Sequence, residues 1–248
     1  MVQTWELVYP FIHYMVIFSS TCLFLSRKSI TPQTAIAHSF WLTLCILYLI
    51  YKVFFLLGFS PFTKIFDYII DILLITWICS STSLKKGLFN LKKIDFRLIR
   101  KYWLLTILLL PVLYGLLLAI LLQPSTVDVN AYHEARVMLL QQQNTFFLNK
   151  FTNYCEVVFG YGYDLVLHNH LRFGHDRGLA IYGYGCFLGA ICLLLNFFDT
   201  KTSLTIIRIL PCILFLGLIE PIYQSLSGQN DLPGAFACLA SLHAYLNW

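Results

Sequence analysis

The chain has 248 residues, of which 58% are hydrophobic and only 12% are charged. Together with a mean hydropathy of +0.72, this composition excludes an ordinary soluble domain and predicts a polytopic membrane protein. The formal net charge of +5 does not indicate a nucleic-acid partner, because the basic residues cluster in one loop.

Apolar windows that match or approach the length of a membrane span recur along the chain. A spanning helix needs about 20 predominantly apolar residues. Such windows lie near residues 7–26, 36–58, 65–82, 102–122, 178–198, 204–224 and 232–247. We therefore expect an all-α transmembrane helical bundle of about seven spans, with four in residues 1–122 and three in residues 178–248. The first span lacks a basic leader and a cleavage site, so we expect it to be retained.

The distribution of basic residues predicts how the bundle is oriented. Arg27 and Lys28 follow the first span. A larger group separates the third and fourth spans: Lys85, Lys86, Lys92, Lys93, Arg97, Arg100 and Lys101. Loops rich in Lys and Arg face the cytoplasm. The N-terminus and residues 123–177 are therefore expected outside, in an integral, multi-pass protein. By helix parity, residues 227–231 face the same side.

Residues 123–177 form a large polar loop between the two sets of spans. The loop holds five of the 12 acidic residues and four of the seven histidines. Ser125 or Thr126 is suited to cap a helix that runs to about Gln142. Its apolar positions predict an amphipathic helix on the membrane surface. Residues 153–171 are aromatic and apolar but carry Glu156 and Asp164, so a surface-lying or re-entrant segment is expected there.

The eight cysteines do not indicate a disulfide framework or a zinc site. None forms a CxxC pair, and seven lie in apolar stretches. Small apolar side chains of this kind are common in helix cores.

The start of the loop carries the most informative polar pattern. Asp128, Tyr132 and Arg136 are spaced i, i+4, i+8, so they share one face of a helix. A carboxylate at a helix start is held ionised by the dipole and can act as a general base. An arginine can bind a phosphate through two hydrogen bonds. The alternative is a capping aspartate beside an arginine that anchors to lipid headgroups.

The motif Asp128-x-x-x-Tyr132-His133-x-x-Arg136-Val137 resembles the first extracytoplasmic loop of GT-C glycosyltransferases. A second matching motif is Gly228-Gln229-Asn230-Asp231, which precedes a helix of small residues. The resemblance covers roughly residues 105–248. The mannosyl- and aminoarabinosyl-transferase branches of the family carry a similar motif. These enzymes take sugars from polyprenyl-phosphate donors.

The resemblance implies inverting sugar transfer to an acceptor hydroxyl at the extracytoplasmic face of a bacterial inner or plasma membrane. Inversion needs one carboxylate base, for which Asp128 is the candidate. The lipid phosphate leaves with a negative charge and needs cations, for which Arg136, Arg172 and Arg177 are candidates. The remaining expected substrate contacts are Tyr132, His133, Glu134, Gln229 and Asp231. The expected partners are the lipid-linked donor, membrane lipids and a membrane protein, with no nucleic acid.

The chain departs from the family in two respects. Many members have paired acids at the loop start, whereas Val127 and Val129 flank Asp128 here. This weakens the case for a metal site, and no cofactor is firmly expected. Family members also run to several hundred residues, so we expect this chain to represent the N-terminal half of such an enzyme.

Two other function classes remain open from the sequence. His168-x-His170, together with His175, Asp164 and Asp176, groups residues that can bind a divalent metal, as in a metal-dependent membrane enzyme. The other alternative is a non-catalytic membrane subunit or scaffold of a larger complex. Asp67 and Asp71, near the start of the third span, are interpreted as markers of that start.

Overall fold

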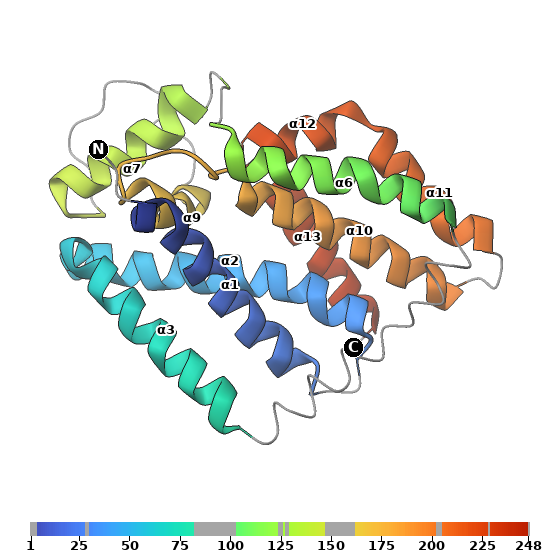
Figure 1. The fold of residues 1–248 in the computed structure, drawn as a ribbon, viewed down its shortest axis with the longest axis horizontal. Helices are drawn as coiled ribbons and strands as arrows, with labels where there is room; N and C mark the ends of the chain where they lie inside the picture. The colour runs from blue at the N-terminus through green and yellow to red at the C-terminus, as the bar shows by residue number, and fades with distance from the viewer. Residues whose placement is uncertain are drawn as a thin grey trace.

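The computed structural model describes residues 4–27, 30–81, 103–123, 126, 129–146, 162–201, 205–227 and 229–247. Within these residues every regular element is a helix, as the sequence predicts, and the helices form one bundle (Figure 1).

The N-terminal helices are α1 (Thr4–Leu25), α2 (Pro32–Leu56) and α3 (Thr63–Ser80), with a short 3-10 turn, η1 (Ser60–Phe62), before α3. The start of α2 is set locally, because the Thr31 hydroxyl accepts a bond from the Thr34 amide at 3.3 Å and Pro32 opens the first turn. α1 packs against both α2 and α3.

The middle of the chain contains α6 (Trp103–Leu121), η2 (Val129–His133), α7 (Glu134–Gln143) and α9 (Gly162–Leu171). η2 is a π-helical turn that runs into α7. The predicted helix to about Gln142 is therefore confirmed, although its first regular turn begins at Val129. The Thr126 carbonyl accepts from the Asn130 amide at 3.2 Å, and residue 125 lies outside the described residues.

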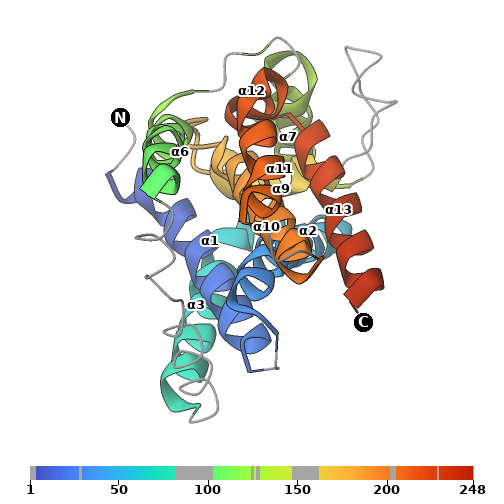
Figure 2. The same cartoon turned by 90° about the vertical axis from the view of Figure 1, so that its right-hand side faces the viewer.

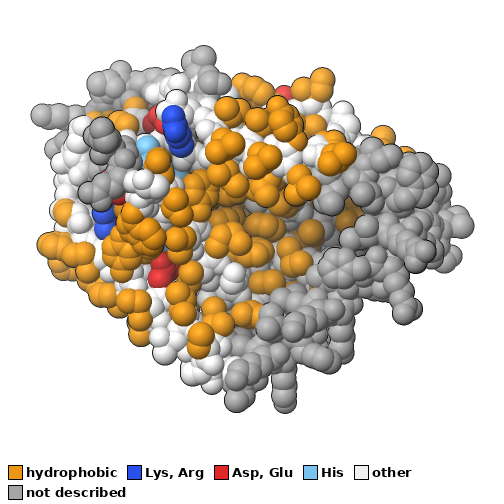
Figure 3. Space-filling model, in the orientation of Figure 1, with side chains coloured by type: hydrophobic (Ala, Val, Ile, Leu, Met, Phe, Trp, Pro, Cys, Tyr) orange, Lys and Arg blue, Asp and Glu red, His pale blue; other side chains and the backbone are white. Residues whose placement is uncertain are grey.

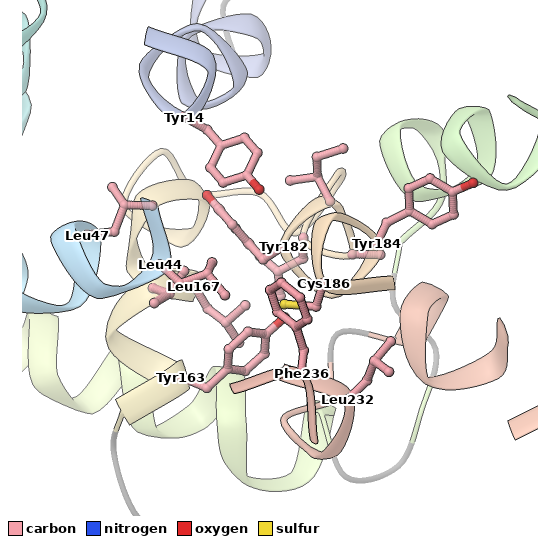
Figure 4. Packing of buried hydrophobic residues seen from close by; sticks show 14 of the residues in the cluster. Tyr14, Leu44, Leu47, Tyr163, Leu167, Tyr182, Tyr184, Cys186, Leu232 and Phe236 are labelled. Atoms are coloured by element: carbon pink, nitrogen blue, oxygen red, sulfur yellow. The ribbon is translucent and has the colours of Figure 1, made fainter. Parts of the chain in front are cut away.

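The C-terminal helices are α10 (Ile181–Lys201), α11 (Thr205–Gly217), α12 (Ile219–Ser227) and α13 (Asp231–Asn247). α10 is the central helix and contacts α2, α6, α11, α12 and α13. Figure 2 shows α3 and α13 on opposite sides of the molecule. Around α10 the core is rich in aromatic side chains, and Tyr14, Tyr163, Tyr182 and Phe236 converge there (Figure 4).

Within the described residues, three helices are long and apolar enough to cross a membrane: α1, α2 and residues 181–198 of α10. The pair α11 and α12 makes a fourth span if its two parts are counted together. The chain is therefore a membrane protein, as its composition predicts. Hydrophobic side chains also spread over much of the coloured surface in Figure 3. These helices account for three or four spans and do not show the seven that the sequence predicts.

Two sequence expectations differ from the structure. The single span expected at residues 204–224 is bent by 64° between Gly217 and Ile219. Residues 153–171 were expected to be surface-lying or re-entrant. The surface-lying alternative is wrong for the described part, because every residue from Tyr163 to Leu171 is buried, whereas the re-entrant alternative stays a prediction. α9 packs against α2 and α7 instead of lying on a membrane surface. Its polar side chains find protein partners there, which makes burial feasible.

Candidate functional site

α9 carries an unusual concentration of buried polar side chains. Asp164, His168, Asn169 and His170 are each at most 1% exposed. Unbonded polar groups in an apolar interior cost several kcal/mol, so such residues persist only where partners are supplied. The partners come from two sides of α9, and they define the candidate site.

One face of α9 is bonded to η2 and α7. The Asp164 carboxylate accepts a bond from Nδ1 of His133 and another from Nη1 of Arg136, the second at 2.5 Å. All three side chains are fully buried. One carboxylate thereby fixes two residues of the predicted motif. It also fixes the His133 tautomer, because Nδ1 must carry the hydrogen that Asp164 accepts.

His168 lies one turn after Asp164 and continues the same face. Its Nδ1 is 3.0 Å from Nε2 of Gln141, and its Nε2 is 3.4 Å from the Thr63 hydroxyl. Burial lowers the pKa of His168 to about 3, so its imidazole is neutral at physiological pH. His168 therefore joins α7, α9 and α3 without adding charge.

The other face of α9 is bonded to α1, α2 and α10. The Asn169 amide nitrogen donates to the Pro10 carbonyl at 3.0 Å and to the Tyr182 hydroxyl at 2.7 Å. Its oxygen accepts from the Tyr51 hydroxyl at 3.0 Å and from Arg172 at 2.8 Å. One amide thus joins four segments of the chain.

A second buried ionic cluster lies beside Asn169. Arg172 forms an ion pair with Asp67 of α3. Asp71, one turn further on, accepts from the Tyr9 hydroxyl at 2.8 Å and from Nδ1 of His13 at 2.8 Å. Asp67 and Asp71 are 0% and 5% exposed. Both lie in the first half of α3, which begins at Thr63, and they also bind α3 to its neighbours.

Three segments meet around the chain that leads to Asp128. The Gln123 amide donates to Asp176 at 2.7 Å. The Gly178 amide donates to the Leu122 carbonyl at 3.5 Å. The Thr126 hydroxyl donates to the Ser227 carbonyl at 3.5 Å. The loop of residues 174–178 therefore adjoins Leu122 and Gln123, and the loop after α12 adjoins Thr126.

Two charged residues, one exposed and one half-buried, lie near the segment that leads to Asp128. Arg177 is exposed, and it lies between Asp176 and Gly178, which make the contacts just described. Glu134 is half-buried, and burial raises its pKa to about 7, with a further upward contribution from the negative charge of Asp176. A carboxyl group with such a pKa can exchange a proton near neutral pH.

The loop before α13 carries the second predicted motif. Gln229 is buried, whereas Asp231 is exposed and accepts a bond from Gln224 at 3.3 Å. Asn230 lines a cavity of about 380 Å³ between α2, the start of α9 and α13. Its other lining residues are largely apolar or aromatic: Trp41, Leu44, Cys45, Tyr48, Gly162, Tyr163, Val166, Pro233, Gly234 and Ala237.

The structure brings some predicted site residues together and separates others. His133 and Arg136 share Asp164, and Glu134 lies next to them in the chain. Arg172 is paired with Asp67 in the second cluster instead. Asp128 and the Tyr132 side chain lie outside the described residues.

The histidines considered as metal ligands have separate partners. His170 Nδ1 contacts the Tyr182 hydroxyl at 2.7 Å, and His175 Nε2 donates to the Glu6 carbonyl at 2.9 Å. In the described part of the chain, no group of three or more His, Cys, Asp or Glu residues is arranged to hold a metal ion.

The residues that organise the site were not predicted as a group. Asp164 was considered only as a metal ligand, and Tyr9, His13 and Tyr51 carried no functional interpretation. The spacing of polar residues could have identified this group. Asp164 and His168, and likewise Asp67 and Asp71, are polar residues at i, i+4 spacing within apolar sequence. No family model, no curated protein and no solved structure matches this chain.

Proposed function

We propose that this chain is a membrane glycosyltransferase, or part of one. In this proposal it transfers a sugar from a polyprenyl-phosphate donor to an acceptor hydroxyl at the extracytoplasmic face, with inversion. The observation that carries the proposal is the contact between Thr126 and Ser227. It joins the segments that lead into the two motifs, residues 128–137 and 228–231, although 101 positions separate its two residues.

In the proposed reaction, Asp128 takes the proton from the acceptor hydroxyl as the oxygen attacks the anomeric carbon. The bond between that carbon and the phosphate oxygen breaks, and polyprenyl phosphate leaves with the bonding electrons. Arg177 is our first candidate to bind the leaving phosphate, because its side chain is exposed and a guanidinium can bond a phosphate through two hydrogen bonds. Asp231 and Gln229 remain candidates to orient the acceptor.

Arg136 has a different proposed role from the one that the motif suggested. Its guanidinium bonds to Asp164 inside the protein. We therefore propose that Arg136 and Asp164 are positioning residues that hold η2 and α7, and with them the chain at Asp128. The cavity beside Asn230 is the proposed binding space for an apolar part of a substrate.

The test is release of polyprenyl phosphate by the purified chain in lipid nanodiscs, supplied with a panel of polyprenyl-phosphate hexoses and pentoses and membrane-extract acceptors. We expect sugar-dependent release by the unmodified chain and loss of release in Asp128→Asn. A matched control is Ser80→Ala at the end of α3, which removes an exposed hydroxyl that bonds to the Thr76 carbonyl of the same helix and should keep full activity. Absence of release by the unmodified chain, or full activity in Asp128→Asn, would contradict the proposal.

A further inference from the structure

Lys52 carries a positive charge within α2, a membrane-spanning helix, and it forms no ion pair with any of the described residues. Its Nζ donates a hydrogen bond to the Tyr48 hydroxyl at 2.9 Å and lies 5.2 Å from the centre of the Tyr48 ring. An ammonium group carries three hydrogen-bond donors, so two remain for a further partner. Charged side chains within membrane spans are costly and commonly mark functional sites.

The direction of the Lys52 side chain differs from that of a simple anchor to the membrane surface. Lys52 lies one turn before the last residue of α2, Leu56, so the end of the helix is about 6 Å away. A lysine that snorkels extends its ammonium group towards the nearer membrane surface. The bond to Tyr48 instead holds the ammonium group one turn towards the middle of the span. The charge is therefore held beside a residue that lines a cavity.

This cavity is the space of about 380 Å³ between α2, the start of α9 and α13. From Tyr48 it extends along α2 to Trp41, which is about 10 Å along the helix axis. Most of its lining is apolar, including Leu44, Val166 and Ala237. Such a lining stabilises an apolar chain, whereas sugar hydroxyls would lose hydrogen bonds there.

The combination of an apolar cavity with a cation at one end selects the kind of occupant. A helix of another protein is about 10–12 Å wide, and it would have to separate α2 from α13, which contact each other. A single hydrocarbon chain needs no such separation. Lysine binds phosphate as a compact point charge, so a phosphate headgroup complements the free donors of Lys52.

We propose that Lys52 and this cavity bind one lipid with a phosphate headgroup: the Lys52 ammonium group binds the phosphate, and the cavity holds one apolar chain. Polyprenyl phosphate and anionic phospholipids share this chemistry. The inference rests on the proposed function only where the lipid is polyprenyl phosphate, and it then adds Lys52 to the substrate site. Lipid binding requires no sugar transfer, so the two proposals can fail separately.

The experiment uses Trp41, which lines the cavity, as a fluorescent probe of the bound chain. The other four tryptophans are replaced by phenylalanine: Trp5, Trp77, Trp103 and Trp248. The protein is placed in phosphatidylcholine nanodiscs, and lipids with brominated chains are added to quench Trp41. Brominated phosphatidic acid should reach half-maximal quenching at about one tenth of the mole fraction that brominated phosphatidylcholine needs, because a hydrogen bond between charged groups contributes roughly a factor of 10.

Three variants test the two parts of the site. Lys52→Gln removes the charge and should abolish the preference for phosphatidic acid. Lys64→Gln is the matched control, because it removes a lysine that pairs with Glu6 and does not line the cavity, and it should keep the preference. Gly234→Leu adds a side chain to the cavity lining, where nothing lies within 4 Å of a new Cβ, and should weaken quenching by both lipids.

Two results of these measurements would overturn the proposal. One is equal half-maximal mole fractions for the two lipids in the parent protein. The other is a preference for phosphatidic acid that persists in Lys52→Gln.

Competition with unbrominated lipids identifies the source of the phosphate. Recovery of Trp41 fluorescence with polyprenyl phosphate but not with phosphatidylglycerol supports a site for the proposed substrate, and recovery with phosphatidylglycerol supports a site for membrane phospholipids. Recovery with neither would overturn the proposal. Asp128→Asn should leave the quenching unchanged, which separates lipid binding from the proposed sugar transfer.

Discussion

Asp164 and Arg136, 28 positions apart in the chain, form an ion pair with a nitrogen–oxygen distance of 2.5 Å. Neither side chain has any exposed surface. The same carboxylate bonds to His133, so Asp164 connects α9 to the π-helical turn before α7.

Asp164→Asn should destabilise the protein strongly. The substitution leaves the Arg136 charge buried without a counter-ion, and loss of one partner of a buried pair costs about 3–5 kcal/mol. We expect a lower unfolding midpoint in detergent micelles. Because the charges depend on each other, Asp164→Asn combined with Arg136→Gln should lose less stability than the sum of the two single variants. Strict additivity would show that the pair does not couple.

Glu134→Gln should change how stability depends on pH. Burial raises the pKa of Glu134 to about 7 from 4.5 in the unfolded chain. The folded state therefore binds this proton more tightly, and the contribution of Glu134 falls as pH rises from about 4.5 to about 7. The glutamine cannot titrate, so the variant should gain stability relative to the parent at pH 8 but not at pH 4. Unfolding midpoints at both pH values test this, and equal differences would contradict it.

Arg177→Gln should weaken the use of a phosphate-bearing donor if the proposed function is correct. A hydrogen bond to a charged group contributes about 1.5–3 kcal/mol, which corresponds to roughly a 10- to 100-fold loss in kcat/KM. Arg177→Lys keeps the charge and should lose less. The measurement is the initial rate of polyprenyl-phosphate release over a range of donor concentrations. Unchanged kinetics in Arg177→Gln would remove this residue from the proposed site.

Gly189→Ala should disturb the packing of α10 against α13. A Cβ at this position would lie 2.4 Å from Cζ of Phe236, a side chain that is 1% exposed and has little room to move. Overpacking of this kind costs about 1–3 kcal/mol. Gly234→Ala on α13 is the matched control, because nothing lies within 4 Å of its added Cβ. Equal unfolding midpoints for the two variants would contradict this account.

The class of the protein follows from its amino-acid sequence. Apolar length and low charge predict membrane helices, and α1, α2 and α10 meet those requirements in the structure. Local chemistry also determined single helix ends, such as the cap of α2 at Thr31. These features depend on neighbours in the chain, so composition and spacing are enough to predict them.

The partners of the polar residues depend on how the helices pack together. Asp164 meets Arg136, Asp67 meets Arg172, and Thr126 meets Ser227 across 28, 105 and 101 positions respectively. The acidic residues Glu156 and Asp164 within an apolar stretch predicted a surface-lying or re-entrant segment at residues 153–171, because unpaired acidic side chains are costly in an apolar interior. α9 overcomes that cost with partners from α1, α2, α3, α7 and α10, and such partners become visible only when the helices are packed together.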